Sequence, residues 1–543
     1  MRPGLQAAGG LARLSFLMEL HGQQLIATTP SAEGSTTFRA RNPAGGAELP
    51  TAFHESTSAE INRALESASS AFQPYRKLPA ARRAEFLEAI ADEIEALGDA
   101  LLERAGKETG LPPARLQGER ARTTSQARSF AALIREGAWV DARIDHAEPD
   151  REPIPKPDVR SMLLPVGPAV VFGASNFPLA ISVAGADTIA ALGAGCPVVV
   201  KAHPGHPGAC EMVARAVLAA ADRCGMPDGV LSLVHGASHE VGAALVEHPL
   251  TKVVAFTGSL AGGRALADLC AARPEPIPFY GELGSVNPVF LLPGALAERA
   301  EAIAEGFVGS LNLGVGQFCT NPGLVLGLEG ADFQSFEEKT SELVTAAVPA
   351  TMLHAGIHQG YVSGVERIRS SKGVESLATS KSDADASQAQ AACAVFRTTA
   401  ATLLADPTLE EEVFGPASTL VNCSCAEDLL EYARQMTGSL TATIHGTEAD
   451  LESHADLVAL LEEKVGRLLF NGFPTGIEVC PAMHHGGPYP ASTHSHFTSI
   501  GTRTILKFTR PFCYQGFPAS ALPAELQESN PMGITRLVDG KLC

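Results

Sequence analysis

The chain has 543 residues, of which 45% are hydrophobic and 19% are charged, and its formal net charge at pH 7 is −19. It is too long for a single hydrophobic core, so we expect two or three packed regions. The acidic balance argues against nucleic acids and anionic membranes as partners. The 11 cysteines include no CxxC pair, which argues against a disulfide framework and predicts a reducing compartment, the cytoplasm.

The first 17 residues form an N-terminal extension that we predict to be disordered. They hold two arginines and a weakly apolar Leu-Ser-Phe-Leu segment, which is too short and too mild for a secretory signal. A transit peptide stays open as an alternative, and Met18 is an alternative start of the protein.

Residues 57–135 are predicted to be helical, with a cap at Ser56 or Ser58. Their apolar residues recur at helical spacing, as in Phe86, Ile90, Ile94, Leu97 and Leu101. Residues 138–163 then contain two alternating runs around a proline-rich turn. This pattern predicts a β-hairpin that projects from the helical part.

From residue 164 onward, short apolar runs alternate with helical segments. The predicted strands are 166–172, 197–200, 231–234 and 253–256, and the predicted helices are 182–192, 210–224 and one starting at 260. This alternation is typical of a parallel sheet covered on both faces, where ligands bind beyond the carboxyl ends of the strands. It also explains the uncharged stretch 162–186, because prolines interrupt it and argue against a membrane span.

Later segments carry weaker signals. The Ala-, Ser-, Asp- and Gln-rich run 375–395 is predicted to be a loop or a solvated helix, and the alternating residues 504–510 are predicted to form a strand.

Cys319 lies in the glycine-rich, nearly uncharged stretch 309–323, which ends in Asn-Pro-Gly. A thiol on such a turn is reachable by a small substrate, and nearby backbone N–H groups favour its thiolate form. A cysteine chosen at random is more often a buried core residue. Glu282 favours the interpretation of Cys319 as a catalytic thiol. This glutamate follows an apolar strand beside glycines and should be poorly solvated, as a general base requires.

Several motifs together resemble the aldehyde dehydrogenase superfamily. They occur in family order: Phe-Gly-Ala-Ser-Asn-Phe-Pro (172–178), Lys201, Phe-Thr-Gly-Ser (256–259), Glu-Leu-Gly (282–284), Gly-Gln-Phe-Cys-Thr (316–320), Glu-Glu-Val-Phe-Gly-Pro (411–416) and Phe-Asn-Gly (470–472). The order and the number of these motifs make the resemblance highly specific.

The resemblance implies a role for each matching residue. Cys319 would be the nucleophile that forms a thiohemiacetal and then a thioester. Glu282 would activate the hydrolytic water, and deprotonation of the thiol is a second role that stays open for it. Asn176 and the backbone N–H of Cys319 would form the oxyanion hole. The implied cofactor contacts are Ser175, Lys201, His203, Gly258, Ser259, Glu412 and Phe414.

One departure from the family pattern concerns the choice between NAD and NADP. Many members have Lys-Pro-Ser-Glu where this chain has Lys201-Ala202-His203-Pro204, and their glutamate holds the adenosine ribose and repels a 2′-phosphate. Pro204 can do neither, while Lys201 and His203 are candidate cationic partners of the phosphate. We therefore expect either cofactor to be accepted, with NADP slightly favoured.

The segments 200–208, 470–493 and 510–515 narrow the resemblance. They are similar to the branch that contains α-ketoglutaric semialdehyde (2,5-dioxovalerate) dehydrogenases and NADP-linked fatty aldehyde dehydrogenases, and the ending 530–540 favours the semialdehyde enzymes. An anionic tail at the far end of the substrate needs a cation in the substrate tunnel. The candidates for substrate contacts are Arg122, Arg128 and Phe177, although either arginine can equally be a surface residue.

Three other interpretations are less favoured. The histidines His484, His485, His494 and His496 lie in a Gly- and Pro-rich loop without fixed spacing, so no metal site is expected. A catalytically inactive structural homologue would have lost the nucleophile or the base. Acylating, coenzyme A-dependent relatives commonly lack the base that Glu282 supplies.

The implied architecture is α/β. It has a Rossmann-type cofactor domain (18–137 and 164–281), an α/β catalytic domain (282–495) and a small bridging β-sheet (138–163 and 496–543). The bridging sheet would complete a neighbouring subunit, which predicts a homodimer or a homotetramer.

Overall fold

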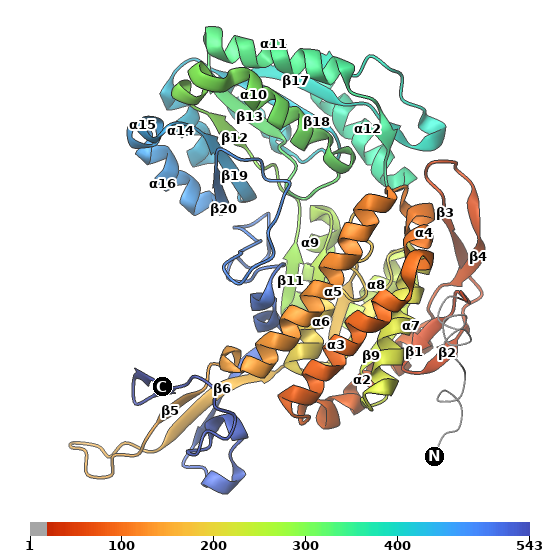
Figure 1. The fold of residues 1–543 in the computed structure, drawn as a ribbon, viewed down its shortest axis with the longest axis vertical. Coiled ribbons are helices and arrows are strands. Elements are labelled where there is room, and N and C mark those ends of the chain that lie inside the picture. Colours follow the sequence, from red (N-terminus) through yellow and green to blue (C-terminus); the bar gives the residue numbers. More distant parts are fainter. Residues whose placement is uncertain (1–18) are drawn as a thin grey trace.

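The computed structural model describes residues 19–543. Its largest elements are two seven-stranded sheets and one five-stranded sheet, and the three follow one another along the long axis of the molecule (Figure 1). The extension predicted for residues 1–17 lies outside the described residues. The mixed α/β architecture with parallel strands agrees with the predicted fold class.

The first sheet has the strand order β11-β10-β7-β8-β9-β1-β2. Its five parallel strands are β7 (Ala169–Phe172), β8 (Val198–Lys201), β9 (Leu231–Val234), β10 (Val253–Thr257) and β11 (Phe279–Glu282), and the antiparallel edge is β1 (Gln24–Ile26) and β2 (Thr29–Ser31). The four strands predicted between residues 164 and 256 are all present, with bounds that differ by a few residues at most. The separate pair β3 (Thr37–Arg41) and β4 (Glu48–His54) was not predicted.

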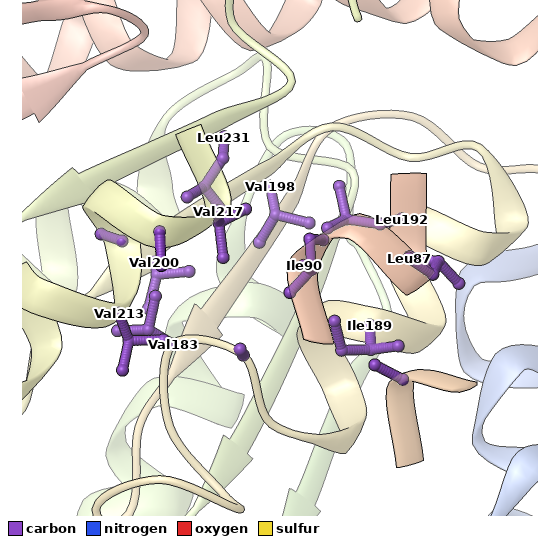
Figure 2. Close-up of a cluster of buried hydrophobic side chains, with 14 of the residues drawn as sticks. Leu87, Ile90, Val183, Ile189, Leu192, Val198, Val200, Val213, Val217 and Leu231 are labelled. Carbon is purple, nitrogen blue, oxygen red and sulfur yellow. The ribbon is translucent and has the colours of Figure 1, made fainter. Parts of the chain in front are cut away.

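Helices cover both faces of this sheet because successive residues of each strand are buried on opposite sides. Val171, Val198 and Val200 pack against one group of helices: α3 (Ala80–Ala96), α4 (Gly98–Thr109), α5 (Pro113–Glu136), α6 (Ala186–Ala194) and α7 (Pro207–Arg223). Val170 and Val199 pack on the other face against α2 (Ser58–Arg76), α8 (His239–Glu247) and α9 (Leu260–Ala272). Figure 2 shows side chains of α3, α6 and α7 meeting those of β8 and β9.

The chain order of the strands creates a switch point in the first sheet. From β7 the chain proceeds through β8 to β9 on one side, and then returns to β10 and β11 on the other side. The loops after β7 and β10 therefore diverge and leave a crevice beyond the carboxyl ends, which is where open α/β sheets bind ligands.

The second sheet has the order β15-β17-β18-β13-β12-β19-β20. Its strands are β12 (Val289–Leu291), β13 (Leu324–Leu328), β15 (Glu375–Thr379), β17 (Ala394–Thr399), β18 (Ala417–Cys423), β19 (Ser439–His445) and β20 (Val465–Phe470). All pairs are parallel except β15 with β17. It is covered by α10 (Pro293–Asn312) and α11 (Ala331–Ala346) on one face, and by α13 (Ala400–Ala405), α14 (Ala426–Gln435) and α16 (Ala455–Lys464) on the other.

The third sheet projects from the body of the molecule (Figure 1). Its order is β21-β6-β5-β22-β23, formed by β5 (Arg143–Asp145), β6 (Val159–Pro165), β21 (Thr509–Gln515), β22 (Leu537–Val538) and β23 (Lys541–Leu542). The antiparallel pair β5–β6 confirms the predicted hairpin.

Three local predictions were wrong. The cap of α2 is Thr57 rather than Ser56 or Ser58, because Thr57 and Glu60 form a reciprocal capping box. Residues 502–508 form a 3₁₀ helix, and the strand begins only at Thr509. The segment 375–395 contains β15 and the short β16 (Gln390–Ala391), since β17 and β14 (Ala350–Thr351) provide partners for them.

Two global features accompany this fold. Between residues 19 and 543, no helix combines the length and the apolar character needed to cross a membrane. All 11 cysteines are free thiols.

Candidate active site

A cavity of about 1050 Å³ lies at the switch point of the first sheet and extends to α12 (Ala355–Ser370) and to the loop before β18. It is lined by every residue proposed above for catalysis or cofactor contact: Ser175, Asn176, Lys201, His203, Gly258, Ser259, Glu282, Cys319, Glu412 and Phe414. They come from segments separated by up to about 240 residues in the sequence, and the fold brings them to one cavity.

Cys319 is carried by an irregular segment that follows α10. Val315 has a φ of +60°, which is strained for a β-branched residue. Gly316 also has a positive φ, and a Cβ there would lie 2.3 Å from the carbonyl carbon of Gly415, so only glycine fits. The side chain of Asn287 holds this segment in place, since its Nδ2 donates to the carbonyl of Cys319 at 2.9 Å.

Cys319, His485 and Glu282 form a compact contact group. The Sγ of Cys319 lies 3.4 Å from Nε2 of His485, and the same nitrogen lies 3.2 Å from Oε1 of Glu282. Glu282 and His485 are each 1% exposed. When Nε2 is unprotonated it can accept the thiol proton, and the N–H formed in this way can then donate a hydrogen bond to Oε1 of Glu282.

The protonation states of this group follow from burial and charge. Burial raises the pKa of the Cys319 thiol well above its usual value, and the negative charge of Glu282 raises it further. Burial also acts to raise the pKa of Glu282, but His485 outweighs burial, through the positive charge that the imidazole carries once it has taken a proton and through its hydrogen bond, and lowers that pKa to about 2. The expected burial of Glu282 is confirmed, whereas the net shift of its pKa is downward. The resting site is a thiol beside a carboxylate.

Asn176 is 9% exposed and lies on the loop after β7. Its Nδ2 donates to the carbonyl oxygen of Gln317 at 3.1 Å, which ties this loop to the Cys319 segment. A side-chain amide has two N–H donors, so the second one is available to an oxygen atom bound next to Cys319.

The opposite part of the cavity has the donors and acceptors of a dinucleotide site. Ser259 caps α9, whose N-terminus opens into the cavity and favours an anion such as a pyrophosphate. Lys201 ends β8 and donates to the carbonyl of Gly236, and burial lowers the pKa of its ammonium to about 8. Glu412 is open to the cavity but enclosed by protein, which raises the pKa of its carboxyl to about 8.

His203 does not have the charge that we expected of it. Burial lowers its pKa well below the usual value, and the neighbouring His206, His354 and Lys201 lower it further. Its Nδ1 accepts a hydrogen bond from the backbone N–H of Gly205 at 3.0 Å. His203 is therefore a neutral lining residue, and Lys201 is left as the cation of that pair.

The two arginines proposed for substrate contact lie on different faces of α5. Arg128 is exposed and forms ion pairs with Asp92 and Glu95 on α3, so its proposed role is wrong. The guanidinium carbon of Arg122 lies 5.3 Å from the ring centre of Phe177, and its positive charge acts to lower the pKa of Cys319. Arg122 and Phe177 are thus near the nucleophile, although neither lines the large cavity.

Sequence reasoning missed His485, which it treated only as one of four loop histidines. No local signal separates His485 from its neighbours, because its partner Glu282 is 203 residues away. Across residues 19–543, the potential metal ligands gathered within 4.8 Å are those of Glu282, Cys319 and His485. That set does not combine His484, His494 and His496, so the loop does not gather its histidines into one ligand group.

Comparison with known proteins gives a consistent result. Residues 29–491 match the model of the aldehyde dehydrogenase family. The chain is 49% identical to α-ketoglutaric semialdehyde dehydrogenase 2 of Azospirillum brasilense, over 96% of this chain and 100% of that protein. It is 44% identical to α-ketoglutaric semialdehyde dehydrogenase of Acinetobacter baylyi, over 97% of this chain and 99% of that protein.

Among solved structures, the fold is similar to that of 1-pyrroline-5-carboxylate dehydrogenase from Thermus with bound NAD. The TM-score is 0.76 at 21% identity, and the match covers 94% of this chain and 97% of that one.

Proposed function

The chain belongs to the aldehyde dehydrogenase family, and from this premise we propose that it oxidises α-ketoglutaric semialdehyde to 2-oxoglutarate. The observation that carries the reaction is the contact of the Cys319 thiol with His485 and Glu282 at the end of a dinucleotide-sized cavity. The identity of 49% to a full-length α-ketoglutaric semialdehyde dehydrogenase supports the substrate.

The first step is attack of Cys319 on the aldehyde carbon. His485 accepts the thiol proton on Nε2, and the carboxylate of Glu282 stabilises the resulting imidazolium. The C–S bond forms while the aldehyde oxygen becomes an oxyanion. Asn176 and the backbone N–H of Cys319 donate to that oxygen, an arrangement worth roughly 3–4 kcal/mol per donor in acyl-transfer enzymes.

The second step is oxidation at the same carbon. Lys201 and Glu412 would hold the two cofactor riboses, and Ser259 with the N-terminus of α9 would hold the pyrophosphate. NAD(P)⁺ bound there supplies the hydride acceptor. Asn176 keeps the oxyanion aligned as the carbonyl re-forms, and the substrate is left as a thioester on Cys319.

Hydrolysis completes the cycle. Oε2 of Glu282 is buried and has no hydrogen-bond partner among the described residues, so it is available to orient a water molecule and accept its proton. The hydroxide adds to the thioester, the C–S bond breaks, and the sulfur takes back the proton held by His485. Glu282 and the product acid then release one proton each.

The finer cofactor preference rests on the loop after β8. Pro204 and Lys201 both line the cavity, and no carboxylate occupies the position of Pro204 that would repel a 2′-phosphate. We therefore favour NADP over NAD. We also favour a cytoplasmic homodimer or homotetramer, because the thiols are free and the third sheet projects from the body.

A matrix of initial rates tests these proposals. Purified protein is assayed with α-ketoglutaric semialdehyde, succinic semialdehyde and a long-chain aldehyde, each with NAD and with NADP. The highest kcat/KM is expected for the oxo-semialdehyde with NADP. A maximum at the long-chain aldehyde would identify a fatty aldehyde dehydrogenase instead, and a large advantage of NAD would refute the cofactor preference.

A further inference from the structure

One face of α5 carries an unusual stripe of polar side chains. Arg115, Glu119, Arg122 and Gln126 follow one another at intervals of four, three and four residues, which places them on the same side of the helix. Glu119 is 4% exposed and Gln126 is 3% exposed. A buried polar stripe of this kind is costly unless each group has a partner.

The first two residues of the stripe have partners. Oε1 of Glu119 accepts hydrogen bonds from the backbone N–H groups of Leu179 and Ala180, at 2.7 and 3.0 Å. The guanidinium of Arg115 is 3.7 Å from the carboxylate of Glu119. These contacts dock the stripe against the loop that carries Asn176.

Arg115 also packs against two aromatic rings. Its guanidinium carbon lies 4.5 Å from the ring centre of Phe177 and 4.7 Å from that of Phe318. Phe318 directly precedes Cys319, so the stripe reaches the immediate surroundings of the nucleophile.

The last two residues of the stripe have buried polar atoms without a hydrogen-bond partner among residues 19–543. Nε and Nη2 of Arg122, and both polar atoms of the Gln126 amide, are buried without a hydrogen bond. Leaving such groups unpaired costs about 1–3 kcal/mol each, and more when the group is charged. The described residues thus present a cation and an amide, one helical turn apart, that a polar ligand would satisfy.

Another arginine near the nucleophile does not compete for this ligand. Arg467 also interacts electrostatically with Cys319, but its Nη1 and Nη2 donate to the carbonyls of Gly476 and Pro474. Arg467 therefore holds the 474–476 loop with two of its nitrogens and, among residues 19–543, leaves only Nε unpaired, whereas Arg122 leaves Nε and Nη2 unpaired, the two parallel donors that a carboxylate needs.

We propose that Arg122 and Gln126 bind the 2-oxo-carboxylate end of the substrate, the guanidinium pairing with the carboxylate and the amide N–H₂ donating to the 2-oxo oxygen. Arginine suits this task because its parallel N–H groups match the two carboxylate oxygens. This inference rests on the proposed function and adds the basis of substrate specificity. The enzyme recognises the end of the substrate opposite to the aldehyde.

Three five-carbon aldehydes allow the carboxylate contact and the 2-oxo contact to be tested separately. α-Ketoglutaric semialdehyde has the carboxylate and the 2-oxo group, glutaric semialdehyde has only the carboxylate, and pentanal has neither. Arg122→Met and Gln126→Met preserve side-chain length without the polar atoms. Arg128→Met is the matched control, since Arg128 lies on the same helix but faces solvent.

Each variant has a distinct expected result. Arg122→Met should lower the kcat/KM of both acids relative to pentanal by about 10- to 100-fold, the size of a lost hydrogen bond to a charged group. Gln126→Met should lower the ratio of α-ketoglutaric to glutaric semialdehyde by roughly 5- to 10-fold, as for a neutral hydrogen bond. Arg128→Met should leave both ratios unchanged.

The outcomes also separate this inference from the proposed function. A wild-type enzyme that prefers pentanal to both acids would refute the proposed substrate itself. If wild type prefers the oxo acid and Arg122→Met lowers all three rates equally, the inferred carboxylate contact is wrong. An unchanged oxo-acid preference in Gln126→Met would refute the second contact. Thermal denaturation checks that each variant is folded.

Discussion

The reactivity of Cys319 depends on where its proton goes. Burial and the charge of Glu282 raise the pKa of the thiol well above its usual value, so at neutral pH the resting sulfur is protonated and weakly nucleophilic. Activation therefore needs a proton acceptor in contact with Sγ. Nε2 of His485 is in contact with Sγ and is itself backed by the carboxylate of Glu282.

Replacing His485 with Asn should remove this acceptor. We expect the first turnover to slow by about 100-fold at neutral pH, in the range of a lost general base. The rate should recover as the pH rises, because the remaining thiolate fraction then follows the raised pKa of Cys319. Stopped-flow measurement of cofactor reduction across neutral and alkaline pH records this profile.

His484→Asn is the matched control for this experiment. His484 is the neighbouring half-buried histidine, and its replacement should leave the pH profile of the first turnover as in the wild type. A wild-type profile in His485→Asn would mean that Glu282 takes the thiol proton directly, contrary to the relay described above.

At the scale of elements, α5 positions the loop that follows β7. Glu119 accepts hydrogen bonds from Leu179 and Ala180, three and four residues after Asn176. The oxyanion donor is therefore held by a carboxylate on a helix more than fifty residues earlier in the sequence. Small displacements of such a donor lower the rate, since misplacement by about 1 Å can cost on the order of 100-fold.

Glu119→Gln should weaken both hydrogen bonds. We expect a loss of about 1–2 kcal/mol in the free energy of unfolding, because bonds to a charged acceptor become neutral ones. We also expect kcat to fall by roughly 10-fold or more while the KM of the cofactor changes little. Thermal or denaturant unfolding and steady-state kinetics measure the two effects.

Glu108→Gln provides the comparison. Glu108 is fully buried and likewise accepts hydrogen bonds from two backbone N–H groups, those of Gly208 and Ala209 at the start of α7. Its variant should lose similar stability with kcat retained. Equal losses of kcat in the two variants would show that Glu119 has no specific effect on the loop.

Much of the first sheet was predictable at this scale. Strands such as Val198–Lys201 are buried on both faces, so they appear in the sequence as continuous apolar runs separated by helical periodicity. The catalytic residues were found because each belongs to a motif of the family resemblance; Asn176 follows β7 and Glu282 ends β11, whereas Cys319 follows α10. Even Arg128 could have been excluded, because six residues on a helix rotate it about 240° from Arg122.

What could not be predicted depends on contacts between distant segments. β15 forms because β17 pairs with it, and residues 375–379 carry no strand pattern of their own. His485 becomes a partner of Cys319 and Glu282 only when a C-terminal loop folds over β11. The unpaired state of the Gln126 amide is a property of packing, which the sequence does not reveal.

At the scale of the whole molecule, the second sheet ends in the edge strand β20 and the third sheet ends in the edge strand β21. Among residues 19–543, β20 pairs with β19 alone and β21 pairs with β6 alone. β20 ends in Leu468, Leu469 and Phe470, and Phe470 is 45% exposed. Exposed apolar edge strands favour association with another chain. β21 lies on the projecting sheet, where a neighbouring subunit can reach it (Figure 1).

We therefore expect β21 of one subunit to extend the second sheet of its partner at β20. Light scattering coupled to gel filtration should give two or four times the chain mass of 56.5 kDa. Cys513→Lys, on an exposed position of β21, should shift the population toward monomer, since a lysine on an edge strand opposes pairing. Cys425→Lys is the control, because Cys425 is exposed and precedes α14, away from both edges. A wild-type mass of one chain would refute the assembly, and an unchanged mass in Cys513→Lys would place the contact elsewhere.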